Sequence, residues 1–405
     1  MRTNAMIIAA LAAILVLAGC ESQPQNNMKY RALGNTGLQV SEIGLGCGGF
    51  SHMTAEEARA FMDRAIDAGC NYIDLYDADP TVRDNIGEGI RGRRSKMMVQ
   101  GHIGSFWKDG HYARTRDVEE ARIGFEDMLE RLGTDCIEVG MIHITDTPEQ
   151  WLEIQGSPFW DYILQLKEEG KIKHIGVSSH NAQVALMAAK SGMVEVIMFS
   201  LNPAFDRLQA GSNVWDPNSY EHMLAGVDPV RVELYDYCAT HGIAITAMKV
   251  FGGGGHLLKA ESSPLKVAFT PVQCIAYSLS KPCVASALVG AGNIEELEAD
   301  LAYLEATDEE KDWNQVMSNT GKALSGDCTY CNHCSPCPHG IEIAVINELL
   351  DKAAEEGATS ELRAHYDELQ HHASECTECG SCASRCPFDV DVPSRMKKAV
   401  EVFGH

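Results

Sequence analysis

The residues with the clearest chemical potential are two groups of cysteines near the C-terminus that share one spacing. In each group two residues separate each of three cysteines from the next, and a fourth cysteine is followed directly by proline. The groups are Cys328, Cys331, Cys334 and Cys337, then Cys376, Cys379, Cys382 and Cys386. Two intervening residues let a tight turn present thiolates to neighbouring irons, and the fourth cysteine commonly ligates the other cluster. The spacing therefore predicts two [4Fe-4S] clusters with interleaved ligands.

The interleaved pattern assigns each cysteine to one cluster. The first cluster would be held by Cys328, Cys331, Cys334 and Cys386, and the second by Cys376, Cys379, Cys382 and Cys337. Structural zinc also binds CxxC pairs, but it needs four ligands and does not account for two CxxCxxC triplets that each have a Cys-Pro. The cysteines at positions 47, 70, 136, 238, 274 and 283 stand in apolar stretches and are expected in the core.

The elements that carry the rest of the chain alternate between short apolar runs and amphipathic helical stretches. This pattern predicts repeated βα units and a parallel sheet. Eight strands are expected near residues 42–47, 71–74, 97–101, 136–143, 174–178, 194–199, 243–249 and 284–290. Eight units in this length predict an α/β fold, a (β/α)8 TIM barrel, with an open doubly wound sheet as the alternative. Apolar residues at helical spacing between the cysteine groups predict a small helical domain that follows the barrel.

Polar residues stand where several of the expected strands end, and in a barrel these ends meet at one mouth. They are Asp74, His102, His143, residues 178–181, Asn202 and Lys249. The long loop at 203–229 contains Trp215 and is expected to form a lid or a wall of the substrate site, with an irregular surface loop as the alternative.

The N-terminus has the composition of a bacterial lipoprotein signal. A positive start, a short apolar run and small residues precede Cys20, which could be acylated after cleavage. The expected organisation is a signal at 1–20, a linker at 21–28, the barrel at 29–310 and the cluster domain at 320–405. This predicts an extracytoplasmic protein that a lipid anchors to the membrane, with an uncleaved N-terminal anchor as the alternative. The 33 basic and 57 acidic residues give a net charge of −24, which argues against a nucleic-acid partner.

Three stretches resemble the aldo/keto reductase family. They are RALGNTGLQVS from Arg31, GKIKHIGVS from Gly170 and AMKVFGGG from Ala247. Together with the C-terminal cysteines, the whole mature chain resembles the iron-sulfur branch of that family. The region between the cysteine groups resembles the α-helical ferredoxin domains of respiratory enzymes.

The resemblance implies a catalytic group of four residues at the barrel mouth. Asp74 matches the family aspartate and His143 the family histidine, whereas the tyrosine position falls on Asp79 and the lysine position on His102. An ionised aspartate cannot donate the proton that a phenol would, and Tyr76 could substitute for the tyrosine after a local shift. We expect Asp74, Asp79, His102 and His143 to manage protons.

The resemblance also implies an NADP(H) site, for which Ser178, Ser179 and Asn202 remain. The family's glutamine falls on Met198, its nicotinamide-stacking tyrosine falls near Leu201, and residues 291–293 lack the basic residue that would hold the 2′-phosphate. NADP(H) binding is therefore doubtful.

Three functions follow as hypotheses. The favoured one is an iron-sulfur oxidoreductase that acts on a small carbonyl or alcohol substrate, with a redox protein or membrane electron carrier as partner. The alternatives are an electron-transfer protein whose barrel is catalytically degenerate and an NADPH-dependent carbonyl reductase.

Overall fold

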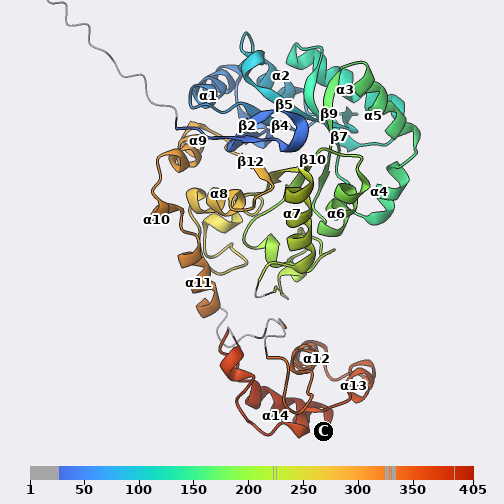
Figure 1. The fold of residues 1–405 in the computed structure, drawn as a ribbon, viewed down its shortest axis with the longest axis vertical. Helices are drawn as coiled ribbons and strands as arrows, with labels where there is room; N and C mark the ends of the chain where they lie inside the picture. The colour runs from blue at the N-terminus through green and yellow to red at the C-terminus, as the bar shows by residue number, and fades with distance from the viewer. Residues whose placement is uncertain are drawn as a thin grey trace, which may run out of the picture.

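The main body of the computed structural model is a closed barrel of eight parallel strands (Figure 1). The structure describes residues 27–221, 223–224, 226–323, 328, 330, 334–386 and 388–405. The barrel strands are β3 (Ile43–Gly46), β4 (Tyr72–Leu75), β5 (Met98–Ile103), β8 (Ile137–Ile142), β9 (Ile172–Ser179), β10 (Val196–Ser200), β11 (Ala244–Met248) and β12 (Val284–Val289). The pairing of β12 with β3 closes the ring, which confirms the predicted barrel and its eight strands.

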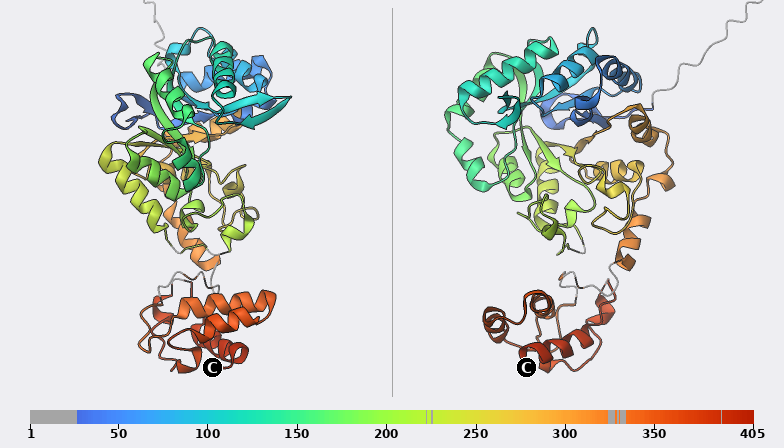
Figure 2. Two further views of the ribbon diagram at one scale, coloured as in Figure 1. Left: turned by 90° about the vertical axis from the view of Figure 1, so that its right-hand side faces the viewer. Right: turned by 180° about the vertical axis from the view of Figure 1, so that it is seen from behind.

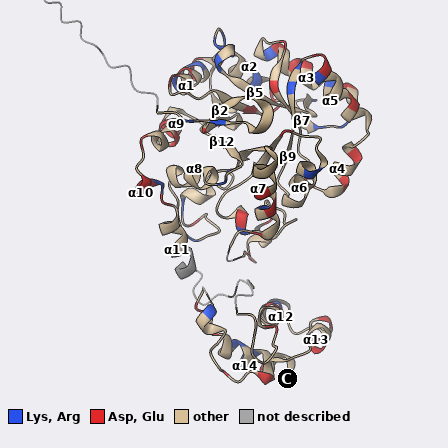
Figure 3. Cartoon of the chain, in the orientation of Figure 1, with Lys and Arg blue, Asp and Glu red and all other residues tan. Residues whose placement is uncertain are grey.

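Helices surround the barrel, as Figure 2 shows from two further sides. They are α1 (Ala55–Asp67), α2 (Pro80–Gly89), α3 (Val118–Leu132), α4 (Pro148–Ile154), α5 (Pro158–Glu168), α6 (Ala182–Ser191), α7 (Pro229–His241), α8 (Pro271–Leu279) and α9 (Ile294–Leu301). Their starts follow local capping chemistry: Thr54 and Glu57, for example, form a reciprocal capping box at α1. Acidic side chains are spread over these outer helices (Figure 3).

A short N-terminal hairpin closes the barrel at the end where its strands begin. β1 (Tyr30–Ala32) and β2 (Gln39–Ser41) pair antiparallel. Leu33 and Val40 from this hairpin are fully buried in the interior cluster that also contains Val196 and Ala244, the first residues of two barrel strands. The opposite end, where the strands finish, is therefore the open one.

A second hairpin, absent from the expected elements, follows β5. β6 (Ser105–Lys108) pairs with β7 (His111–Arg114), and Asp109 and Gly110 form the turn with φ of 53° and 82°. Positive φ at both central turn residues matches the twist of the two strands, and Asp-Gly is a preferred sequence for it. The hairpin brings β7 beside the open end of the barrel.

The C-terminal region forms a separate helical core. After α10 (Asp308–Lys311) and α11 (Asn314–Ala323) come α12 (Ile343–Glu356), α13 (Ser360–Asp367) and α14 (Val392–Phe403). Ile346 and Tyr366 are fully buried in this core, which confirms that the apolar spacing between the cysteine groups is helical.

Within the described part of the chain, no helix has the length and apolar character needed to cross a membrane. The predicted signal, most of the predicted linker and the proposed acylation site Cys20 lie outside the described residues.

Candidate functional site

A cavity opens at the end of the barrel where the strands finish. Several strands contribute a lining side chain at or just beyond their last residues. These residues are Asp74, His102, His143, Ser178, Met198, Met248, Lys249 and Leu288. The structure therefore brings together three of the four predicted catalytic residues in one cavity.

Asp74, His102 and His143 form a continuous hydrogen-bonded chain. His102 Nε2 lies 3.0 Å from Asp74 Oδ1, and His102 Nδ1 lies 2.7 Å from His143 Nδ1. Because a carboxylate only accepts hydrogen bonds, we assign the His102 proton to Nε2, which leaves Nδ1 as an acceptor for the Nδ1–H of His143. His143 Nε2 is then also an acceptor.

The hydroxyl of Tyr112, on β7, meets His143 at this acceptor, so Tyr112 donates to His143 Nε2. Tyr112 lines the cavity, and partial burial raises the pKa of its phenol to about 12. Burial is also the main reason that the pKa of His143 is held well below its ordinary value, so the imidazole is neutral. Tyr112, His143 and His102 thus donate in order along a chain that ends on the Asp74 carboxylate.

Buried polar residues beneath the chain fix Asp74. Gln100 Nε2 donates to Asp74 Oδ1 at 2.6 Å, while its own Oε1 accepts from Tyr72 at 2.8 Å and from Thr246 at 3.0 Å. Asp74 Oδ2 is buried and has no hydrogen-bond partner among the described residues. One carboxylate oxygen is thus held by two donors and the other is left available.

Asp79 lies apart from this group. It is the N-cap of α2, where its Oδ1 accepts the backbone N–H of Thr81 at 2.7 Å, and it does not line the cavity. Tyr76 does line the cavity, beside Asp77. Sequence reasoning missed Tyr112 because it lies in the unpredicted hairpin, although the Asp109-Gly110 turn was a readable signal.

The three predicted cofactor-binding residues are placed differently. Ser178 lines the cavity, and its Oγ accepts the backbone N–H of Ile144 at 2.8 Å. Ser179 lies within hydrogen-bonding reach of Asp146 Oδ1 at 3.4 Å and does not line the cavity.

The Asn202 side chain hydrogen-bonds to backbone groups and does not line the cavity. Its Oδ1 accepts from the N–H groups of Ala204 and Phe205 at 3.0 and 2.9 Å, and its Nδ2 donates to the Lys249 carbonyl at 2.9 Å. Of the three residues, the structure brings only Ser178 to the cavity.

The part of the cavity beyond β12 does not fit a 2′-phosphate. The backbone N–H of Gly292, which could bind an anion, is taken by the Glu296 carboxylate at 2.7 Å. Asp300 adds a second carboxyl group that is 3 % exposed, and burial, aided by Glu296, raises its pKa to about 8. A 2′-phosphate would have to displace the Glu296 carboxylate from the Gly292 N–H, so the residues present here do not fit NADP(H).

Lys249, directly after β11, places a cation in the cavity. Its Nζ lies 4.8 Å from the ring centroid of Trp215, a residue of the 203–229 loop that also lines the cavity. Burial lowers the pKa of this ammonium group, and the nearby Asp74 carboxylate opposes the shift. Because Trp215 lines the cavity, the 203–229 loop forms one of its walls.

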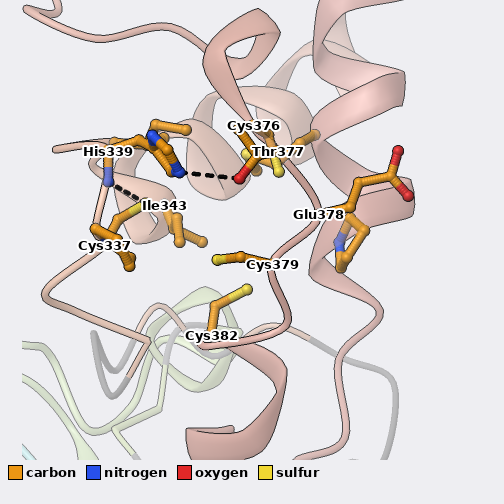
Figure 4. Close-up of a pocket in the computed structure, with 12 residues that line it drawn as sticks. Cys337, His339, Ile343, Cys376, Thr377, Glu378, Cys379 and Cys382 are labelled. Carbon is orange, nitrogen blue, oxygen red and sulfur yellow. Dashed lines mark hydrogen bonds between the residues drawn. The ribbon is translucent and has the colours of Figure 1, made fainter.

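The helical domain contains a second pocket, lined by cysteines. Cys337 from the first motif and Cys376, Cys379 and Cys382 from the second all line it (Figure 4). These four have the identities that the interleaved pattern assigns to the second cluster. The backbone N–H of His339 points to Cys337 Sγ at 3.4 Å, and Ser381 lies 3.5 Å from Cys379 Sγ, contacts that stabilise thiolates.

The donor set of this pocket fits a [4Fe-4S] cluster. In such a cluster each thiolate binds a different iron, so the ligands surround more space than those of a single ion. Among the residues in the described ranges, no three His, Cys, Asp or Glu side chains are arranged around one metal ion.

The first predicted cluster is described only in part. Cys328, Cys334 and Cys386 are half-buried and pack against the core of the helical domain. Arg385 holds the loop of the first motif, since its Nη2 donates to the carbonyls of Cys334 and Pro336 at 2.6 and 2.8 Å. Cys331 lies outside the described residues.

Comparison with known proteins places the barrel in a family. A model of the aldo/keto reductase family matches residues 42–273. The chain is 29% identical over 294 residues to the uncharacterized oxidoreductase YqkF of Bacillus subtilis, covering 68% of this chain and 90% of that protein. It is 24% identical over 309 residues to L-galactose dehydrogenase of Arabidopsis thaliana, covering 68% of this chain and 88% of that enzyme.

A solved structure named as an aldo-keto reductase shares the fold. The structure of aldo-keto reductase AKR11C1 from Bacillus halodurans superimposes with a TM-score of 0.57 at 22% identity, covering 72% of this chain and 96% of that chain. The family match extends over more than half of the sequence. This chain therefore belongs to the aldo/keto reductase family of oxidoreductases.

Proposed function

We propose that this protein is an iron-sulfur oxidoreductase of the aldo/keto reductase type. It acts on a small carbonyl or alcohol substrate in the barrel cavity, and two [4Fe-4S] clusters in the helical domain pass the electrons. The observation that carries the proposal is the pocket in which Cys337 joins Cys376, Cys379 and Cys382. Cys337 comes from the other motif, as expected when two clusters exchange their fourth ligands.

The cysteine residues define where the clusters would be held. Cys337, Cys376, Cys379 and Cys382 would hold one cluster, and Cys328, Cys331, Cys334 and Cys386 the other. When bound, the clusters supply one-electron oxidation and reduction, which the side chains of the barrel cannot supply.

Oxidation of an alcohol to a carbonyl releases two electrons and two protons, one from the hydroxyl and one from the C–H bond. The electrons would pass one at a time to the clusters, and the C–H proton would pass to solvent in the open cavity. The barrel residues would move the hydroxyl proton. The substrate hydroxyl gives its proton to the Tyr112 oxygen while the Tyr112 proton passes to His143 Nε2. The proton on His143 Nδ1 then passes to His102 Nδ1, and the proton on His102 Nε2 passes to Asp74 Oδ1. One proton enters at the phenol and one arrives at the carboxylate, so Tyr112 never carries a lasting negative charge. Reduction of a carbonyl runs the same transfers in reverse.

The electron partner follows from the cofactor site. Because the Glu296 carboxylate occupies the Gly292 N–H beyond β12, the proposed electron partner is a redox protein or a membrane electron carrier rather than NADP(H). Acylation of Cys20 would anchor the chain to the membrane on its extracytoplasmic side.

An anaerobic titration tests this function. The cluster-loaded full chain is titrated with dithionite and, separately, with NADPH, while visible absorbance and EPR are recorded. The proposal predicts bleaching and the EPR signals of reduced clusters with dithionite but not with NADPH. Bleaching by NADPH would support the nicotinamide-dependent reductase instead, and a protein that carries no cluster would overturn the proposal.

A further inference from the structure

The carboxyl groups that line the barrel cavity either accept hydrogen bonds from within the protein or have a raised pKa. Asp74 accepts from Gln100 and His102, and Glu296 accepts from the backbone of Gly292. Asp77 accepts the N–H of Asp79 at 3.0 Å. With its raised pKa, Asp300 is mostly protonated at neutral pH. None of these carboxyl groups forms an ion pair with Lys249, and Asp300 contributes little negative charge at neutral pH.

The Lys249 ammonium group has no such partner. Its Nζ rests on the face of the Trp215 ring, and among the described residues no carboxylate lies within ion-pairing distance of it. Trp215 is itself held edge-on against His180, with ring centroids 5.3 Å apart. A cation that rests on an aromatic face keeps its charge while its remaining N–H donors stay free for a ligand.

The backbone holds Lys249 in a costly conformation. Its φ is 59°, in the left-handed region that residues with a β-carbon rarely adopt. Asn202 stabilises this conformation by donating to the Lys249 carbonyl at 2.9 Å. Backbone strain of this kind persists where the surrounding structure fixes a side chain for a task. The side chain held in this way lines the cavity.

We propose that Lys249 Nζ binds the carboxylate of the substrate, which makes the substrate a small oxo or hydroxy acid. This inference rests on the proposed function, since it assumes that the barrel cavity is the substrate site. Of the two lysines in the described lining, Lys249 is half-buried and Lys259 is exposed at the rim, and no arginine lines the cavity. One half-buried ammonium group matches one negative charge better than a phosphate dianion. The carboxylate at Lys249 would fix the orientation of the molecule while its oxygen faces Tyr112.

Binding of charged and uncharged analogues tests the assignment. The full chain, with its cluster content measured in parallel, is titrated calorimetrically with pyruvate, 2-oxobutyrate and 2-oxoglutarate, and with the neutral analogue pyruvamide. At least one acid should bind, and pyruvamide should bind more weakly than pyruvate by roughly tenfold or more, as expected for loss of a charge-assisted hydrogen bond. Binding by none of the acids, or equal binding of pyruvate and pyruvamide, would overturn the inference.

Variants locate the interaction. Lys249→Met should weaken acid binding by roughly 10- to 100-fold and leave pyruvamide binding nearly unchanged, while Lys249→Arg should recover part of the loss. Lys259→Met removes the same charge from the exposed rim and serves as the matched control, with a change of about twofold or less. Acid binding that survives Lys249→Met in a folded protein contradicts the proposal. The clusters are measured separately. A chain with two clusters but no acid binding would contradict this inference without contradicting the proposed function.

Discussion

The Tyr112 hydroxyl donates to His143 Nε2, although the two residues are 31 positions apart and lie on different elements. Tyr112 comes from the hairpin after β5, whereas His143 directly follows β8. Arg116 holds the backbone of His143 in place, because its Nη2 donates to the His143 carbonyl at 2.6 Å. The barrel thus has a phenol beside its buried histidines, whereas Asp79, the residue expected at the tyrosine position, caps α2 away from them.

Removing the phenolic oxygen tests whether Tyr112 exchanges the substrate proton. Tyr112→Phe should lower kcat by roughly 10²- to 10⁴-fold, the usual contribution of a positioned acid or base, with little change in substrate affinity. His111→Gln alters the exposed neighbour on the same strand and should leave turnover within about twofold. A larger loss in Tyr76→Phe than in Tyr112→Phe would transfer the role to Tyr76.

The histidine protons test the direction of the chain. Long-range ¹H–¹⁵N spectra should show the proton on Nδ1 of His143 and on Nε2 of His102. In Tyr112→Phe, the His143 Nε2 resonance should shift most, because it loses its donor. The opposite tautomers would contradict the assigned order of donors.

The lowered pKa of His143 gives a stability change with a defined sign. In the unfolded chain this histidine takes up a proton as the pH falls through about 6.5, while the buried imidazole in the folded protein stays neutral. The unfolded state therefore binds more protons, and this residue lowers the free energy of unfolding as the pH falls through that range. Titration of His143 near its ordinary value in the folded protein would contradict this.

Asp300 predicts a change in stability at higher pH. Its folded-state pKa of about 8 lies above the ordinary value, so the unfolded chain loses this proton first as the pH rises. The buried carboxyl group therefore costs no stability in acid, and the cost grows from about pH 4 until the pH passes the folded-state pKa.

Asp300→Asn should remove that cost. The variant should gain on the order of a few kcal/mol relative to the parent at about pH 9, and little at about pH 4, measured by chemical denaturation. Glu295→Gln, on the exposed face of the same helix, is the control and should show no comparable pH-dependent gain. An equal gain for Asp300→Asn at both pH values would show that ionisation is not the cause.

The sequence predicted the barrel well because its signal is local. Each strand is a short apolar run between helical stretches, and the observed bounds lie within a few residues of those expected. The same applies to the helical domain, where the spacing of Ile346, Leu349 and Tyr366 reflects a buried helical face.

The site was harder to predict because it depends on contacts between distant residues. Asp79 precedes Pro80 and caps α2, and a residue pattern of Asp before Pro is itself an N-cap signal that could have been read. The pairing of Tyr112 with His143 depends on where the hairpin folds over the barrel, which no local pattern determines. Asn202 likewise has a residue type suited to ligands, but its amide supports the backbone of Lys249.

Iron and spin counting in Cys337→Ser tests the central claim most directly, because Cys337 joins the second motif's pocket from the first motif. The anaerobically loaded parent should contain about eight irons per chain, as two [4Fe-4S] clusters require, and two reducible centres by EPR. Cys136→Ser, which alters a half-buried cysteine of the barrel, should match the parent. Cys337→Ser should perturb the cluster held by Cys376, Cys379 and Cys382 and lower its iron content, while the other centre keeps its spectrum. Two unaltered centres in Cys337→Ser, or a parent chain that binds no cluster, would contradict the central claim.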